Sequence, residues 1–114
     1  MSKKRDFRDY LHDILISIDS IQEFIAGMTQ DQFLQDKKTR DAVVRNLEII
    51  GEAVNKLPQD IQDKYPQASW REIVSMRNKM IHEYFGIDFE IVWQTMHEDL
   101  EPLKQTVKKI ISGL

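Results

Sequence analysis

Apolar residues recur every three or four positions along most of the chain, the spacing expected when one face of an α-helix is buried. The first such stretch predicts a helix from about Arg5 to Ala26, ended by Gly27. Its inward positions are Phe7, Leu11, Ile14, Leu15, Ile18, Ile21 and Ile25. Thr29 then has the pattern of an N-cap, and Gln32 completes a capping box that predicts a short helical turn.

A second apolar stretch predicts a long helix from about Thr39 to Leu57. Its inward positions are Val43, Val44, Leu47, Ile50, Val54 and Leu57. Gly51 lies inside this helix, where glycine costs about 1 kcal/mol relative to alanine. Either another helix approaches closely at this point, or the glycine is tolerated on the surface. Pro58 should stop the helix, and residues 58–65 have room for one more short helix.

The spacing of Ser69 and Glu72 is that of a capping box, which predicts a third helix from Trp70 to about Tyr84 or Phe85. Gly86 should end that helix.

Asp88 should cap a last helix from about Phe89 to Ser112, and Pro102 should kink or divide it. With short connections throughout, the pattern predicts an all-α, antiparallel four- to five-helix bundle that forms one domain over residues 1–114.

Composition narrows the class of protein without selecting a function. The 114 residues include no cysteine, which excludes disulfides and thiolate metal sites and favours the cytoplasm. The charged N-terminus, residues 1–6, is followed by no apolar segment typical of a signal peptide, and no stretch is apolar enough for a membrane span. The net charge of -3 argues against a broad basic surface for nucleic acid, although a local basic cleft remains compatible with it.

The third predicted helix carries an unusual charge. At 100° per residue, Arg77 falls in the middle of the apolar stripe. The other members of this stripe are Trp70, Ile73, Val74, Ile81 and Tyr84. Asn78 and His82 share one flank of the helix, and Lys79 and Glu83 lie on the solvent side.

A guanidinium on an apolar face needs a carboxylate partner, access to water, or a cleft. One interpretation is an ion pair with the preceding long helix, for which the candidate partners are Asp41, Glu48 and Glu52. The other is a polar cleft in which Arg77 binds an anion, because its planar fork donates two parallel hydrogen bonds to a phosphate.

His82 is the candidate for proton transfer, because histidine exchanges protons readily near neutral pH. Asn78 lies one turn earlier and is placed to orient the imidazole ring. Neither His12, on the polar side of the first helix, nor His97, in a charged patch, is expected to be catalytic. The chain has no glycine-rich phosphate loop and no histidine pair at metal-ligand spacing, so we expect no metal and no cofactor.

The segment Arg77-Asn78, three residues, His82-Glu83-Tyr84 resembles the motif of HEPN ribonucleases, in the form found in HepT toxins. The resemblance extends over nearly the whole chain. It includes residues 8–11, 13–14, 41–53, 65–66, 92–93 and 99–100, together with Trp70.

This resemblance implies the toxin half of a type VII toxin–antitoxin pair, whose partner is a minimal nucleotidyltransferase, MntA. It implies a homodimer with two motifs facing each other across a cleft, and possible larger assemblies with the antitoxin. It further implies metal-independent RNA cleavage by attack of the 2′-hydroxyl, with Arg77, Asn78 and His82 as catalytic residues.

The resemblance also implies that the partner silences the toxin by transferring AMP to Tyr84. Two alternatives stay open on the sequence alone. The chain could be a non-catalytic nucleotide-binding or interaction subunit of a nucleotidyltransferase complex, or an adaptor bundle whose last helices bind partner helices.

Overall fold

The computed structural model describes residues 5–114. These residues contain six α-helices and one 3-10 helix. The helices are α1 (Phe7–Ile25), α2 (Gln30–Gln35), α3 (Lys37–Asn55), α4 (Gln59–Lys64), α5 (Trp70–His82), η1 (Tyr84–Gly86) and α6 (Phe89–Ser112). No strand occurs among these residues, and the all-α fold is confirmed. Residues 1–4, the start of the charged N-terminal segment, lie outside the described residues.

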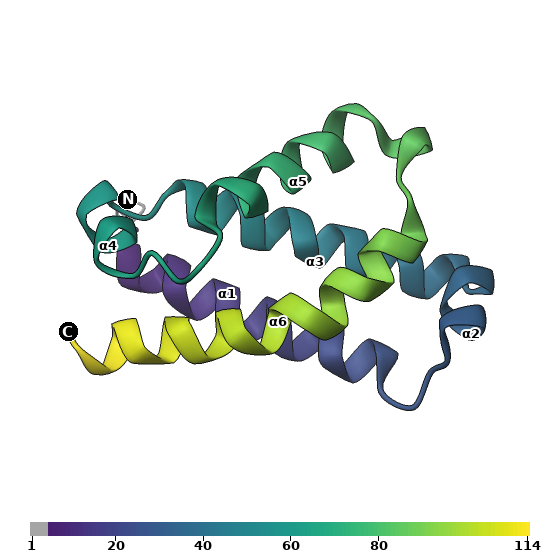
Figure 1. The fold of residues 1–114 in the computed structure, drawn as a ribbon, viewed down its shortest axis with the longest axis horizontal. Coiled ribbons are helices and arrows are strands. Elements are labelled where there is room, and N and C mark those ends of the chain that lie inside the picture. The colour runs from purple at the N-terminus through teal and green to yellow at the C-terminus, as the bar shows by residue number, and fades with distance from the viewer. Residues whose placement is uncertain (1–4) are drawn as a thin grey trace.

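The four longer helices form the body of the molecule. α1 packs against both α3 and α6, and α3 packs against α5 on its other side. Figure 1 shows α5 diverging from α6, with the loop around η1 joining their far ends, while both chain termini lie at the opposite end. α3 therefore holds α5 in place, and the site is built where these two helices meet.

The core follows the predicted apolar stripes. Four α1 residues, Leu11, Ile14, Ile18 and Ile21, are completely buried. From α3 and α6 the most deeply buried side chains are Val43, Val54, Val107 and Ile110. Burial of this apolar surface is the main stabilising contribution to such a bundle.

Capping side chains define most helix ends. The Thr29 hydroxyl accepts from the Gln32 backbone N–H at 3.1 Å, and the Gln32 side chain accepts from the Thr29 N–H at 2.9 Å, as the sequence predicts. The Asp88 carboxylate caps α6, also as predicted. α3 begins before Thr39, at Lys37, because Asp36 accepts from the Thr39 N–H at 3.0 Å and so supplies the N-cap.

The helix α5 begins at Trp70 as predicted, but its predicted capping box and its predicted end are wrong. Ser69 makes no side-chain capping bond, because its ψ of 64° departs from the extended backbone in which a hydroxyl reaches the first turn. The helix also ends at His82, before the predicted Tyr84 or Phe85. Glu83 has φ -132° and ψ 44°, which breaks the helical path, and the chain then turns through η1.

Pro102 does not divide the last helix, since α6 is continuous from Phe89 to Ser112. Proline has no N–H to donate to the carbonyl one turn earlier, so one backbone hydrogen bond is missing at this point. Figure 1 shows α6 changing direction part-way along its length. Within residues 5–114, no helix combines the length and the apolar character needed to cross a membrane.

Candidate active site

The close contact between α3 and α5 is centred on Gly51 and Arg77. A Cβ atom added to Gly51 would lie 2.2 Å from the Arg77 Cβ and 2.7 Å from its Cγ. Gly51 is buried, so the interpretation of it as a tolerated surface glycine is wrong. The absence of a side chain here lets the aliphatic stem of Arg77 press directly against the α3 backbone.

The guanidinium of Arg77 reaches past this contact to polar partners. Its Nη2 donates to Glu52 Oε2 at 3.0 Å, and its Nη1 donates to Asn78 Oδ1 at 2.8 Å. Of the three carboxylates considered from the sequence, Glu52 is therefore the ion-pair partner. The Nε atom is buried, and no acceptor among residues 5–114 lies within hydrogen-bond distance of it.

The ion-pair interpretation of Arg77 is confirmed, and anion binding stays a prediction. Its side chain is 25% exposed while that of Glu52 is 57% exposed, so the pair opens to solvent. An exposed pair of this kind is weak and readily exchanged. The guanidinium therefore has one carboxylate partner, and that partner is exposed.

The apolar stripe of α5 is narrower than predicted. Trp70 and Met80 are its buried side chains, and Met80 was missed because it lies outside the predicted stripe. Ile81, assigned to the stripe, is 43% exposed. Arg77 remains part of the packed surface, because its aliphatic stem contacts Gly51.

Asn78 and His82 lie on the exposed flank of α5 that the sequence assigns to them. The predicted bond from Asn78 to the imidazole is absent, and the Asn78 oxygen accepts from Arg77. His82 is exposed in the last turn of the helix. His97, by contrast, packs on Trp93 with ring centroids 4.3 Å apart, and its Nδ1 lies 2.9 Å from the Trp93 carbonyl oxygen.

Tyr84 leaves the Arg77 face because α5 ends before it. The turn η1 carries its side chain to α3, where the phenol donates to Asp41 Oδ1 at 2.5 Å. The other Asp41 oxygen accepts from Lys37 Nζ at 2.7 Å. Asp41 and Glu52 lie eleven residues apart on α3, or about 16 Å at 1.5 Å per residue, so Tyr84 and Arg77 are attached at separate points.

These contacts shift the proton affinities of all three groups. The hydrogen bond to Asp41, followed by desolvation, raises the pKa of Tyr84. Hydrogen bonds from Lys37 and then Tyr84 lower the pKa of Asp41. The hydrogen bond between Lys37 and Asp41 also raises the pKa of Lys37. The sequence suggested Asp41 only as a partner for Arg77, and the spacing of Lys37 and Asp41, one helical turn apart, was the available signal for this cluster.

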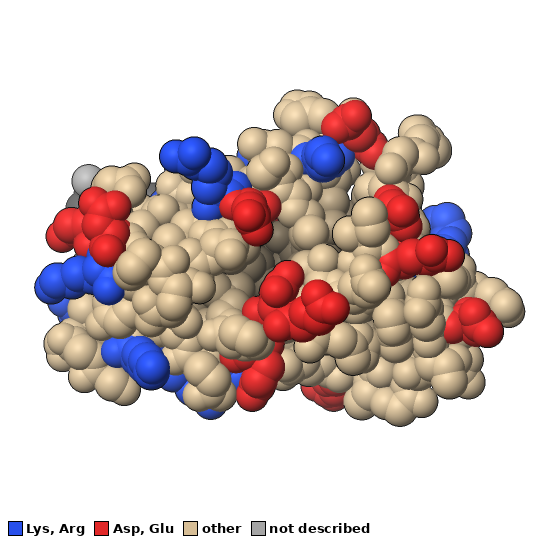
Figure 2. All heavy atoms as spheres, viewed as in Figure 1, with Lys and Arg blue, Asp and Glu red and all other residues tan. Residues whose placement is uncertain are grey.

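Several grooves border α5. The one that includes Asn78, of about 1000 Å³, lies between α5 and α4. Another, of about 370 Å³, opens between α5 and α6 and is lined by Met76, Met80 and Ile91, with Glu72 and Glu83 among its charged residues. In the view of Figure 2 acidic side chains border the hollow between these two helices. This groove holds none of Arg77, Asn78 and His82.

A further groove, of about 460 Å³, lies among α1, α3 and α5 beside the Arg77 partner Glu52, and it includes the exposed Ile81. Three cations line it, namely Arg5, Arg45 and Lys56. Asp13, Glu48 and Glu52 balance them.

Comparison with known proteins identifies the family to which the chain belongs. The family model described as Ribonuclease HepT-like matches residues 14–110. The chain belongs to the HepT-like ribonuclease family. The match spans the α3–α5 contact and the whole segment from Arg77 to Tyr84.

Several curated HepT-like relatives are similar over nearly their full length. The "Probable ribonuclease HepT" of Thermococcus cleftensis is 46% identical over 94% of this chain and 97% of its own. A "Putative RNase" of Methanocaldococcus jannaschii is 45% identical over 94% of this chain and 92% of its own. Another, from Caldanaerobacter subterraneus, is 40% identical over 91% and 93%. No solved structure matches the chain.

Proposed function

We propose that this HepT-like protein is the toxin of a toxin–antitoxin pair, a ribonuclease that cleaves RNA in the cytoplasm without a metal ion. The observation that carries the proposal is the arrangement around Arg77. Its stem is fixed against Gly51, its guanidinium is shared between Asn78 and an exposed Glu52, and His82 is exposed on the same helix. A cation held in this way is suited to stabilise charge on a phosphate.

In the proposed reaction the RNA 2′-hydroxyl attacks the adjacent phosphorus. A bond forms between the 2′-oxygen and phosphorus, and the bond to the 5′-oxygen breaks, which leaves a 2′,3′-cyclic phosphate and a 5′-hydroxyl. His82 moves the proton as base or acid, Arg77 stabilises the phosphorane-like charge, and Asn78 positions the guanidinium. The phosphate takes the place of Glu52 on Arg77.

The proposed active form is a homodimer in which two copies of α5 and η1 line one cleft. The apolar exposure at this end supports it, since Ile81 is 43% and Phe85 fully exposed. Apolar side chains grouped in this way commonly mark an interface. Two facing sites would bring two copies of His82 together, one to accept a proton and one to donate it.

The proposed control is transfer of AMP to Tyr84 by a minimal nucleotidyltransferase antitoxin of the MntA type. The Tyr84 side chain is accessible, being 38% exposed, and lies two residues beyond His82. The added phosphodiester brings a negative charge and a nucleoside to the end of the cleft, where they would obstruct RNA.

The test is RNA cleavage by purified protein in EDTA. His82→Ala should lower the rate at least 100-fold, the usual effect of losing a general acid or base. His12→Ala is the matched control, because His12 is an exposed histidine away from the site. Unchanged cleavage by His82→Ala would remove His82 from the mechanism. Failure of the wild type to cut RNA, together with nucleotide binding, would favour the non-catalytic nucleotide-binding subunit.

A further inference from the structure

We infer that Asp41 is the proton acceptor for Tyr84 when AMP is transferred to it, so that the toxin supplies the base for its own modification. The inference rests on the proposed function, because it concerns the same tyrosine. What carries it is the placement of an exposed tyrosine hydroxyl against a carboxylate from another helix, at 2.5 Å.

The contact fixes both the tyrosine and its proton. η1 follows directly after α5, and this hydrogen bond attaches the Tyr84 side chain to α3. The phenol ring also packs edge-on against Phe85, with centroids 5.6 Å apart. The proton of Tyr84 therefore points at Asp41 Oδ1, which leaves a lone pair on the phenol oxygen free to face solvent and an incoming nucleotide.

Lys37 orients the carboxylate. It binds Asp41 Oδ2 at 2.7 Å and leaves Oδ1 to the phenol. Arg40, on the same helix, is the other cation whose field reaches Asp41 and Tyr84. At rest the proton stays on Tyr84, because the carboxylate raises the pKa of the phenol while Lys37 lowers the pKa of Asp41.

The transfer step balances with groups that the proposal names. The Tyr84 oxygen attacks the α-phosphorus of ATP held by the nucleotidyltransferase. A bond forms between this oxygen and phosphorus, the bond from phosphorus to the bridging oxygen breaks, and pyrophosphate leaves with the electron pair. As the new bond forms, the proton on the phenol oxygen becomes strongly acidic, and it passes to Asp41 Oδ1.

Two roles for Asp41 predict opposite effects of its removal. If transfer required only ionised Tyr84, then Asp41→Asn should accelerate it, because loss of the carboxylate lowers the pKa of the phenol. If Asp41 accepts the proton, the same variant should be slower, because an amide can hold the hydroxyl in place but cannot take up its proton. The direction of the change therefore separates the two roles.

The experiment measures the rate of AMP addition by intact mass, with the full-length protein, the nucleotidyltransferase, ATP and magnesium. We expect Asp41→Asn to be slowed at least 100-fold at neutral pH, the low end of the effect of losing a general base. We also expect its rate to climb with pH as Tyr84 ionises, while that of the wild type stays nearly flat. Asp63→Asn, an exposed aspartate of α4, is the matched control and should behave as the wild type.

The outcomes are distinguishable. An equal or faster rate for Asp41→Asn overturns the inference, and so does a slow rate that does not rise with pH, since that would be a purely positional effect. A wild-type protein that gains no AMP, or gains it away from Tyr84, overturns the proposed control itself.

A second measurement uses the protein alone, without the nucleotidyltransferase. In a carbon-13 titration of the tyrosine rings, Tyr84 should lose its proton at higher pH in the wild type than in Asp41→Asn. Tyr10 and Tyr65 serve as internal references. Identical titration of Tyr84 in both proteins would overturn the contact on which the inference depends.

Discussion

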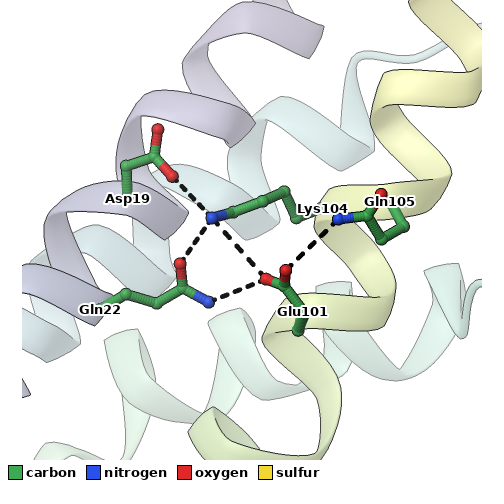
Figure 3. A network of polar contacts seen from close by, with 5 residues as sticks. All are labelled: Asp19, Gln22, Glu101, Lys104 and Gln105. Carbon is green, nitrogen blue, oxygen red and sulfur yellow. Dashed lines mark hydrogen bonds and ion pairs between the residues drawn. The ribbon is translucent and has the colours of Figure 1, made fainter.

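Two partly buried cations each connect a pair of helices in this protein. Lys104 connects α1 and α6, Arg77 connects α3 and α5, and the two differ in the partners that surround them. Lys104 of α6 reaches Asp19 Oδ1 at 2.9 Å, Gln22 Oε1 at 2.6 Å and Glu101 Oε2 at 3.6 Å. Figure 3 shows these side chains converging on its nitrogen from α1 and α6, with Gln105 bound in turn to Glu101. The ammonium group thus has two acceptors within hydrogen-bond distance, Asp19 and Gln22, and a second carboxylate, that of Glu101, close by.

Arg77 is held between α3 and α5 with its hydrogen bonds incomplete. It has one exposed carboxylate partner and one neighbouring amide, while its Nε is buried without an acceptor in the described part of the chain. A buried polar atom without a partner is destabilising, so its persistence calls for an explanation. The network at Lys104 joins two helices with its acceptors in place, whereas Arg77 has a single carboxylate partner that is itself exposed, as the proposed role in phosphate binding requires.

The largest expected effect comes from removing the two cations in parallel. Arg77→Met should lower RNA cleavage at least 100-fold, because the charge that stabilises the transition state is lost while the apolar stem is kept. Lys104→Met should leave cleavage unchanged. The rate of each variant is measured alongside its thermal unfolding, and a loss of cleavage in Arg77→Met that only follows unfolding would make Arg77 another structural cation.

A smaller effect, on stability as well as on cleavage, is expected from filling the contact behind Arg77. Gly51→Ala places a methyl group 2.2 Å from the Arg77 Cβ, so the two helices must separate. Overpacking of this kind costs about 1–3 kcal/mol.

Urea unfolding gives this cost, and Gly86→Ala is the control because an added Cβ there meets nothing within 4 Å. Equal stability of the two variants would show that the contact at Gly51 is loose.

The smallest expected effect is the loss of stability in Lys104→Met. The carboxylates of Asp19 and Glu101 are 67% and 57% exposed, so water can hydrate them in place of the lysine and the free energy of unfolding falls only slightly. The loss should be about 1 kcal/mol, the upper end of the range for ion pairs with exposed carboxylates, and would appear as a melting temperature a few degrees lower. A change in the cleavage rate of the folded variant would contradict the division drawn between the two cations.

The sequence predicts the fold well where apolar periodicity is strong. The stripes of α1 and α3 lie in the core as expected, and the caps at Thr29 and Asp88 are found in place. These features depend on residues close together in the chain, which is why local spacing reveals them.

Local spacing predicts the site less well, because the site depends on contacts between segments that are distant in the sequence. Spacing selects Arg77, Asn78 and His82 as a group, but Glu52 was one of three possible partners, and the bond from Asn78 to Arg77 was not foreseen. The position of Tyr84 was wrong for a single backbone reason, the departure of Glu83 from helical geometry. A periodicity of 100° per residue cannot reveal that departure, since Glu83 is itself a good helix former.

The break at Glu83 means that the helix carrying Arg77 and His82 stops one residue before the segment carrying Tyr84 begins. A short turn deforms more readily than a packed helix, so a nucleotide joined to Tyr84 beside Asp41 can be accommodated while the α3–α5 packing stays intact. The residues proposed for cleavage are thus separated from the residue proposed for control. Under that proposal, modification would add an obstruction to a site that stays assembled, and removal of the obstruction would return a working enzyme without refolding.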